Sequence, residues 1–333
     1  MKISILDQSP VSSGMTQTDA LQASVRLAQL GDKLGYARYW ITEHHDLFGL
    51  ACPNPSVMMS LIGARTHSIR IGAGAVLLPY YKPFHIAETY NLLSTLFPER
   101  IDLGLGRAPG GSAEVSQALS DNYLAAVQKF PEQIDTLQAF LHDQYSDDHM
   151  YSKISPTPVP ETAPVVWLLG TSEKSAELAM KKNLPYAFGH FMSDQSGPEI
   201  VQKYRSGMKE QGNAHDAHVI IAINVICART MEEANDLALS YFLWKIRQDQ
   251  LHSDGRIPSV EEAKQYIFSS EEFEKIEQMK RQILIGDPES VRSGFMELDQ
   301  QYNADEYMIV TIVHDETAKL QSYTLIKEVI DSI

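Results

Sequence analysis

The sequence predicts an α/β protein of the (β/α)8 barrel class, also called a TIM barrel. Short apolar runs rich in β-branched residues alternate along the chain with longer segments of helical period, which is the pattern of parallel βαβ units. Eight such runs are present, and eight units favour closure into a barrel over a doubly wound open sheet. Single barrels commonly reach this length, so we expect residues 1–333 to form one domain.

The predicted strands are short, and the clearest is the glycine-rich run at 69–78, which Pro79 ends. Each of the others is a run of mainly apolar residues that precedes a helical pattern. The eight runs lie at residues 2–6, 38–42, 69–78, 101–105, 165–169, 186–188, 219–226 and 307–313.

The predicted helices are identified by apolar residues that recur on one face. Ile86, Tyr90, Leu93 and Phe97, for example, are spaced i, i+4, i+7 and i+11. We expect helices at residues 16–34, 55–65, 84–97, 131–141, 172–182, 198–208, from 231 onward, around 291–302, and at the end of the chain. Two polar segments break the alternation: a proline-rich excursion at 143–164 and an insertion near 240–280, expected to be helical or mobile.

The composition is that of a soluble, acidic protein. The formal net charge is −15, which disfavours binding to nucleic acids or anionic membrane surfaces. No run of 18 apolar residues predicts a membrane span, and the opening residues lack the pattern of a secretory signal. Two cysteines, Cys52 and Cys227, form no disulfide framework, so we expect a cytoplasmic protein.

Candidate chemistry lies at the carboxyl ends of the predicted strands, where barrels place their sites. After the second strand comes Thr42-Glu43-His44-His45. Neighbouring residues on an extended segment point in opposite directions, so the two histidines are not expected to grip one metal ion. A histidine at the barrel mouth suits proton transfer, whereas the alternative is a hydrogen-bonded pair at a strand end.

Three further strand ends are rich in glycine. Residues 72–75, Gly-Ala-Gly-Ala, permit either a close ligand or tight packing. Residues 104–111 contain Arg107 on a glycine-rich turn, which can hold a phosphate, but they lack the spacing of a dinucleotide fingerprint. Gly170 is followed by Thr171, Ser172 and Ser175 at the start of a helix, a pattern of a phosphate site or of a simple helix cap.

Together these segments resemble the bacterial luciferase-like monooxygenase family. The match runs through YWITEHHDLFGL, IRIGAGAVLLP and AETYNLLSTLFPERIDLGLGR between residues 39 and 107, then VVWLLGTSEKSAELAMKKNLPYAFGHF at 165–191 and ILIGDPESVRSGF at 283–295. The opening KISILDQSPV is similar to a subgroup found in natural-product pathways. The resemblance covers nearly the whole chain apart from about 240–280.

The resemblance implies a (β/α)8 barrel that binds FMN at its mouth. In the family, reduced flavin forms a C4a-hydroperoxide with oxygen and oxidises an organic substrate. A separate NAD(P)H:flavin reductase would supply the reduced FMN, and family habit implies a homodimer. By match to the family's motifs, the implied catalytic residue is His44, with no metal, and the implied flavin-binding residues are Gly74, Ala75, Arg107, Thr171, Ser172 and Ser175.

Gly74 and Ala75 match a strand bulge that often holds a non-prolyl cis peptide in the family. One departure concerns Gly106, because luciferase itself has a reactive cysteine at that place, so light-emitting aldehyde oxidation is not expected. We also expect part of 245–280 to close over the flavin as a lid. The alternatives are a flavin- or deazaflavin-dependent reductase or dehydrogenase on the same fold and a non-catalytic flavin-binding protein.

Overall fold

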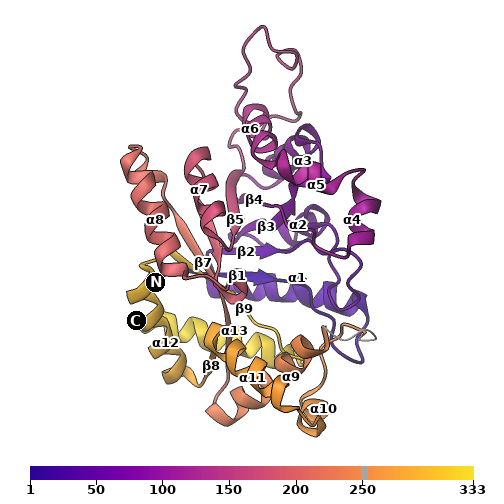
Figure 1. Cartoon of the computed structure of the whole chain (residues 1–333), viewed down its shortest axis with the longest axis vertical. Helices are drawn as coiled ribbons and strands as arrows, with labels where there is room; N and C mark the ends of the chain where they lie inside the picture. Colours follow the sequence, from indigo (N-terminus) through magenta and orange to yellow (C-terminus); the bar gives the residue numbers. More distant parts are fainter. Residues whose placement is uncertain (249–253) are drawn as a thin grey trace.

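The computed structural model describes residues 1–248 and 254–333. Its centre is a closed ring of eight parallel strands surrounded by helices (Figure 1). The ring consists of β1 (Ile3–Asp7), β2 (Arg38–Ile41), β3 (Arg70–Leu77), β4 (Ile101–Gly106), β5 (Val165–Gly170), β6 (Tyr186–Gly189), β7 (Val219–Cys227) and β9 (Glu306–Val310). Pairing of β1 with β9 and of β9 with β7 closes the ring. The predicted barrel and all eight predicted strands are confirmed.

A ninth strand, β8 (Ile283–Gly286), was not predicted as a strand. The first half of β7 pairs with β6, from Val219 to Ala222, and its second half pairs with β8, from Asn224 to Cys227. The strand β8 therefore extends the barrel wall beyond the point where β6 ends. Its four residues were too few to stand out from the helical segments around them.

The predicted helices are present with ends shifted by a few residues. They are α1 (Gln17–Leu34), α2 (Pro55–Gly63), α3 (Pro83–Leu96), α6 (Phe130–Leu141), α7 (Glu173–Lys182), α8 (Gly197–Glu210), α9 (Met231–Gln248), α12 (Pro288–Tyr302) and α13 (Glu316–Asp331). Two short helices were missed, α4 (Ala113–Leu119) and α5 (Tyr123–Gln128). They bury almost no side chains, so they lack the apolar period on which the predictions depend.

The two polar segments have different structures. The stretch between α6 and β5 projects away from the barrel as a long loop without helix or strand, as expected (Figure 1). The insertion contains α10 (Val260–Gln265) and α11 (Ser270–Met279), which lie near α9 and β8. Ile257 is joined by backbone hydrogen bonds to Val11 and Ser13, so this part of the insertion is fixed to the loop after β1. Residues 249–253, which belong to the predicted lid, lie outside the described residues.

The amino-terminal end of the barrel is closed by a buried ionic network. Arg38 donates to both carboxylate oxygens of Glu306, at 2.7 and 3.1 Å, and to Asp102 at 2.8 Å. Trp40 and Arg70 also donate to Asp102. Burial opposes the ionisation of Glu306, but the nearby His218, whose Nε2 lies 3.8 Å from Glu306 Oε2, and the charge of Arg38 lower its pKa to about 2. Within the described residues, no helix is long and apolar enough to cross a membrane.

Candidate functional site

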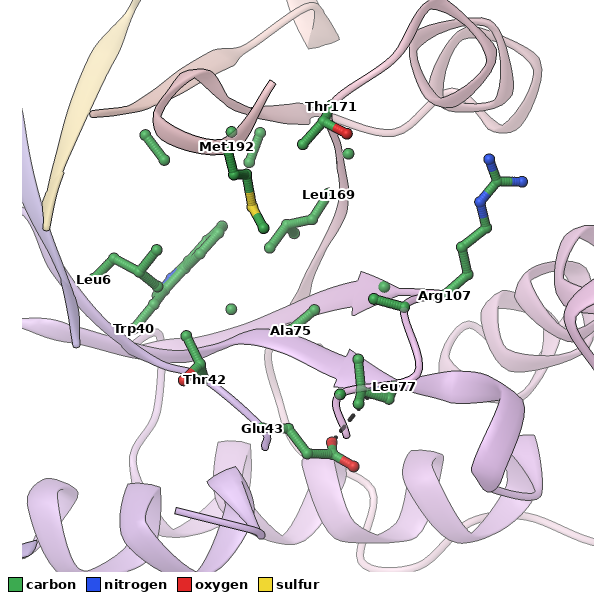
Figure 2. A pocket seen from close by; sticks show the side chains of 18 of the residues that line it. Leu6, Trp40, Thr42, Glu43, Ala75, Leu77, Arg107, Leu169, Thr171 and Met192 are labelled. Atoms are coloured by element: carbon green, nitrogen blue, oxygen red, sulfur yellow. Dashed lines mark hydrogen bonds between the residues drawn. The ribbon is translucent and has the colours of Figure 1, made fainter. Parts of the chain in front are cut away.

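A cavity of about 400 Å³ lies at the carboxyl ends of the barrel strands (Figure 2). This volume falls in the range of small-molecule sites. The structure brings every predicted site residue to its wall: His44, Gly74, Ala75, Arg107, Thr171, Ser172 and Ser175. These residues follow β2, β4 and β5 or lie in β3, so segments far apart in the sequence meet in one place.

The cavity has an apolar end and a polar end. Leu6 and Trp40 lie at the left of the view in Figure 2, Ala75 and Thr171 lie nearer its middle, and Arg107 lies at the right. An elongated ligand with a flat apolar part and an anionic part would match this distribution. Ala222 and Met308 also line the cavity.

The glycine pattern of β3 and β4 is explained by a bulge. The register between these strands shifts between Ala73 and Val76, and the Gly74–Ala75 peptide is cis, as expected for this segment. A Cβ at Gly104 would lie 2.2 Å from the carbonyl oxygen of Ala73, so only glycine fits beside the bulge. A Cβ at Gly74 would lie 2.9 Å from Leu6, at the cavity wall.

The two histidines after β2 point in different directions, as predicted. His44 lines the cavity, and its Nδ1 is hydrogen bonded to Thr42 Oγ1 at 2.9 Å. His45 turns away, and its Nε2 is 2.9 Å from Glu43 Oε1. Because Thr42 engages Nδ1, Nε2 is the ring nitrogen of His44 left to act on a ligand.

The environment of His44 keeps its ring neutral. Burial, and then the neighbouring His45, lower the pKa of His44 from 6.5 to about 4. A neutral imidazole can accept a proton or a hydrogen bond at Nε2 when its own proton is on Nδ1, where it is donated to Thr42 Oγ1. This is the protonation state that a general base requires.

Glu43 is a buried residue whose structural role the sequence did not reveal. One of its carboxylate oxygens accepts from Tyr81 at 2.8 Å and faces His45, and the other accepts from the backbone N–H of Leu77 at 3.1 Å (Figure 2). It thereby ties the end of β2 to the end of β3, beside His44. Its only sequence signal was its position next to the histidine pair.

Arg107 and the turn after β5 form the polar end of the cavity. The Arg107 side chain is exposed at the end of β4, and its guanidinium forms no ion pair with residues 1–248 or 254–333. Thr171 and Ser172 precede α7, whose first backbone N–H groups carry partial positive charge. The combination provides a cation, hydroxyl groups and a helix amino terminus.

Ser175 also reaches the cavity wall, but its hydroxyl is already engaged. It donates to the carbonyl oxygen of Ser172 at 2.6 Å and is 2.8 Å from the Tyr186 hydroxyl. The backbone N–H of Ser172 donates to it at 3.2 Å. The contacts of Ser175 therefore fix the turn that carries Thr171 and Ser172.

A second cavity, of about 650 Å³, adjoins the first and was not predicted. The two share Gln8, His44, Phe191 and Met192 in their walls. The second cavity is otherwise lined from the loop after β2, from α9 and from β7, with Asn224 at its inner wall.

The fold and the cavity define a (β/α)8 barrel with a small-molecule site at the carboxyl ends of its strands. Residues 1–303 match the luciferase-like monooxygenase family. The chain belongs to this family, as the motifs indicated, and membership places it among the oxidoreductases.

Similar proteins cover almost the whole chain. An uncharacterized protein of Bacillus subtilis (strain 168), YceB, is 40% identical over 98% of both chains. The N-acetyl-S-alkylcysteine monooxygenase of the same organism is 34% identical over 99% of this chain and 98% of its own. The solved structure of apo-MsnO8 superposes with a TM-score of 0.86 at 31% identity and covers 99% of this chain and 98% of its own.

Two more distant solved structures share the fold. One is the oxygenating constituent of 3,6-diketocamphane monooxygenase of Pseudomonas putida in complex with FMN, with a TM-score of 0.71, 19% identity and coverage of 98% and 97%. The other is an F420-dependent secondary alcohol dehydrogenase, with a TM-score of 0.68, 15% identity and coverage of 100% and 99%. Proteins with this fold therefore include one that binds FMN and one that depends on F420.

Proposed function

We propose that this protein is an FMN-dependent monooxygenase that oxidises a small organic substrate with molecular oxygen. The observation that carries the proposal is the cavity itself, whose wall combines the apolar side chains of Leu6 and Trp40 with Arg107 and the Thr171–Ser172 turn. The flat ring and the phosphate of FMN require this distribution. Reduced FMN, when bound, supplies the electrons that activate oxygen.

In this proposal Arg107 and the turn before α7 would hold the phosphate of FMN, through donation from the guanidinium and from the hydroxyls of Thr171 and Ser172. Ser175 is a positioning residue, because its hydroxyl holds Ser172 and Tyr186. Gly74 and Ala75 allow the ring to approach the backbone of β3.

His44 is the proposed catalytic residue. Its ring is neutral because burial lowers its pKa to about 4, so Nε2 accepts a proton or a hydrogen bond from the reacting groups. In the tautomer that this role requires, Nδ1 donates to Thr42 Oγ1 and Nε2 carries no proton, and this hydrogen bond fixes the ring.

We also propose a cytoplasmic homodimer that receives reduced FMN from a separate reductase. The sequence contains no dinucleotide-binding fingerprint, and this supports an external source of electrons. The exposed apolar side chains Val57, Leu92 and Leu96 surround a groove between α2 and α3, and a second copy of the chain would cover them. The double variant Leu92→Glu/Leu96→Glu should sediment as a monomer and the wild type as a dimer. This result would support the interface.

The test is a titration with FMN in its oxidised and photoreduced forms, followed by admission of oxygen and measurement of its consumption. Binding of FMN with oxygen consumption and oxidised substrate supports the monooxygenase. The dehydrogenase alternative, which the F420-dependent neighbour favours, predicts substrate oxidation without oxygen consumption. Loss of turnover in His44→Ala with unchanged FMN affinity would exclude a binding protein, and failure to bind FMN would refute the proposal.

A further inference from the structure

The strand β7 is apolar except for one residue, Asn224. Alternate residues of a strand face opposite sides, and here the odd-numbered residues pack against the helices in the outer core. The even-numbered residues Ile220, Ala222 and Ile226 pack instead with Trp40, Trp167 and α9. Asn224 is on this second side, so its amide faces the inside of the barrel.

The amide of Asn224 is buried and has no hydrogen-bond partner. Asn224 is 1% exposed, and neither its Oδ1 nor its Nδ2 has a hydrogen-bond partner among the described residues. Burial raises the pKa of Tyr241 on α9, and the nearby Asn224 offsets part of this rise. The two side chains nevertheless form no hydrogen bond of normal geometry. An unpaired buried amide is costly, so a site that retains one is suited to a ligand.

Asn224 lies at the inner wall of the second cavity, two residues along β7 from Ala222 in the first. It also borders a smaller cavity of about 170 Å³. The wall of the second cavity is mixed, with the apolar side chains Leu47, Phe48, Met279 and Ile312 as well as the polar side chains Gln8 and Gln282. The described charged residues there are Asp46, Asp194, Asp254 and Lys245, so the wall offers no excess of positive charge to an anionic ligand.

Resting on the proposed function, we propose that Asn224 determines specificity by binding a primary carboxamide or lactam of the substrate. Such a group presents a C=O and an N–H on one edge, which pair with Nδ2 and Oδ1 of Asn224. A carboxylate would leave Oδ1 facing a second acceptor, and an ester would leave it without a donor. The apolar remainder of the substrate lies along the cavity wall and reaches His44, which both cavities share.

The probes are octanamide, methyl octanoate and octanoate, which differ in the polar group and share an alkyl chain. Calorimetric titration into wild-type protein, with and without FMN, should show octanamide binding at least about tenfold more tightly than the ester or the carboxylate. Asn224→Leu should bind octanamide and methyl octanoate with equal affinity. If the leucine side chain is too large for the site and the variant does not fold, Asn224→Ala should likewise bind the two probes with equal affinity.

Thermal unfolding separates a substrate contact from a structural role. Asn224→Leu should keep or raise the wild-type Tm, because it removes two unpaired polar atoms. Asn91→Leu is the control, because it removes a buried amide whose Nδ2 donates to the carbonyl oxygen of Pro156, while its Oδ1 has no partner among the described residues. That variant should lower Tm and leave the preference for octanamide unchanged.

The inference is overturned if the wild type does not prefer octanamide, if it binds none of the probes at millimolar concentration, or if Asn224→Leu lowers Tm as much as Asn91→Leu. A preference for octanamide together with failure of the same protein to bind FMN would refute the proposed function and support the carboxamide site. FMN binding without the preference would refute the carboxamide site and leave the proposed function standing.

Discussion

The two ends of the barrel contain similar polar side chains, which are paired at one end and unpaired at the other. At the amino-terminal end Arg38, Asp102 and Glu306 are buried, and their charges are paired. At the carboxyl end, among the described residues, Arg107 has no ionic partner and the side-chain amide of Asn224 has no hydrogen-bond partner, and His44 is held neutral. Paired polar groups stabilise the fold, whereas unpaired ones cost stability and are suited to a ligand. The comparison predicts that substitutions at the two ends have different consequences.

Arg38→Met should cause the largest effect. It leaves Asp102 and Glu306 buried without their shared cation, which costs about 3–5 kcal/mol. Urea unfolding at neutral pH measures this loss. Arg26→Met is the control, because its pair with Glu316 is partly exposed and should contribute at most about 1 kcal/mol. Equal losses in the two variants would contradict the proposed difference between the ends.

His44→Gln should change how stability depends on pH. The pKa of His44 is about 4 in the folded protein and 6.5 ordinarily, so between these values the unfolded chain binds a proton that the folded protein does not. The wild type should therefore lose up to about 3 kcal/mol as the pH falls from 6.5 to 4. His44→Gln should lack this loss, whereas His85→Gln, at an exposed site, should retain it. Identical pH profiles in all three proteins would show that His44 titrates normally.

Arg107→Ala should weaken FMN binding without affecting the fold. Loss of a charge-assisted hydrogen bond to the phosphate costs about 1.5–3 kcal/mol, or roughly ten- to a hundredfold in Kd. Riboflavin, which has no phosphate, should bind both proteins alike, and the free energy of unfolding should stay constant. Arg292→Ala tests whether charge alone matters, since Arg292 is exposed on α12. A comparable loss in that control would argue against a phosphate contact.

Ser175→Ala should have the smallest effect, and it should change both the stability of the fold and the affinity for FMN. Its hydroxyl holds the turn through Ser172 and Tyr186, so stability should fall by about 1 kcal/mol. FMN affinity should fall by less than in Arg107→Ala, because Ser175 acts through Ser172. Ser60→Ala, whose hydroxyl bonds only to its own helix, should change neither. A loss of FMN affinity as large as that of Arg107→Ala would indicate direct contact with the phosphate.

Much of the candidate site could be predicted from the residues at the carboxyl ends of the predicted strands. His44, Arg107 and Thr171 were predicted to meet because parallel strands in a barrel end at the same face, and the structure places all three at one cavity. The opposite directions of His44 and His45 followed from the alternation of an extended chain. The roles of these residues remain proposals.

Other features could not be read from the sequence. The engagement of the Ser175 hydroxyl depends on Tyr186, which is 11 residues further along. The helices α4 and α5 bury too little to leave an apolar pattern, although Ser112 and Asn122 cap them and were usable signals. The second cavity is lined by loops and helices distant in sequence, so no motif marks it.

The sequence by itself determined the barrel, its strand order and the place of its mouth. These depend on local periodicity, because burial of one side of each element selects a period of two or of 3.6 residues. Only the tertiary structure decided which polar groups are paired. Asn224 is one polar residue in an apolar strand, and whether it is satisfied depends on what α9 and β8 bring near it. Hydrogen bonding needs a partner within about 3 Å, and that partner is set by packing rather than by sequence distance.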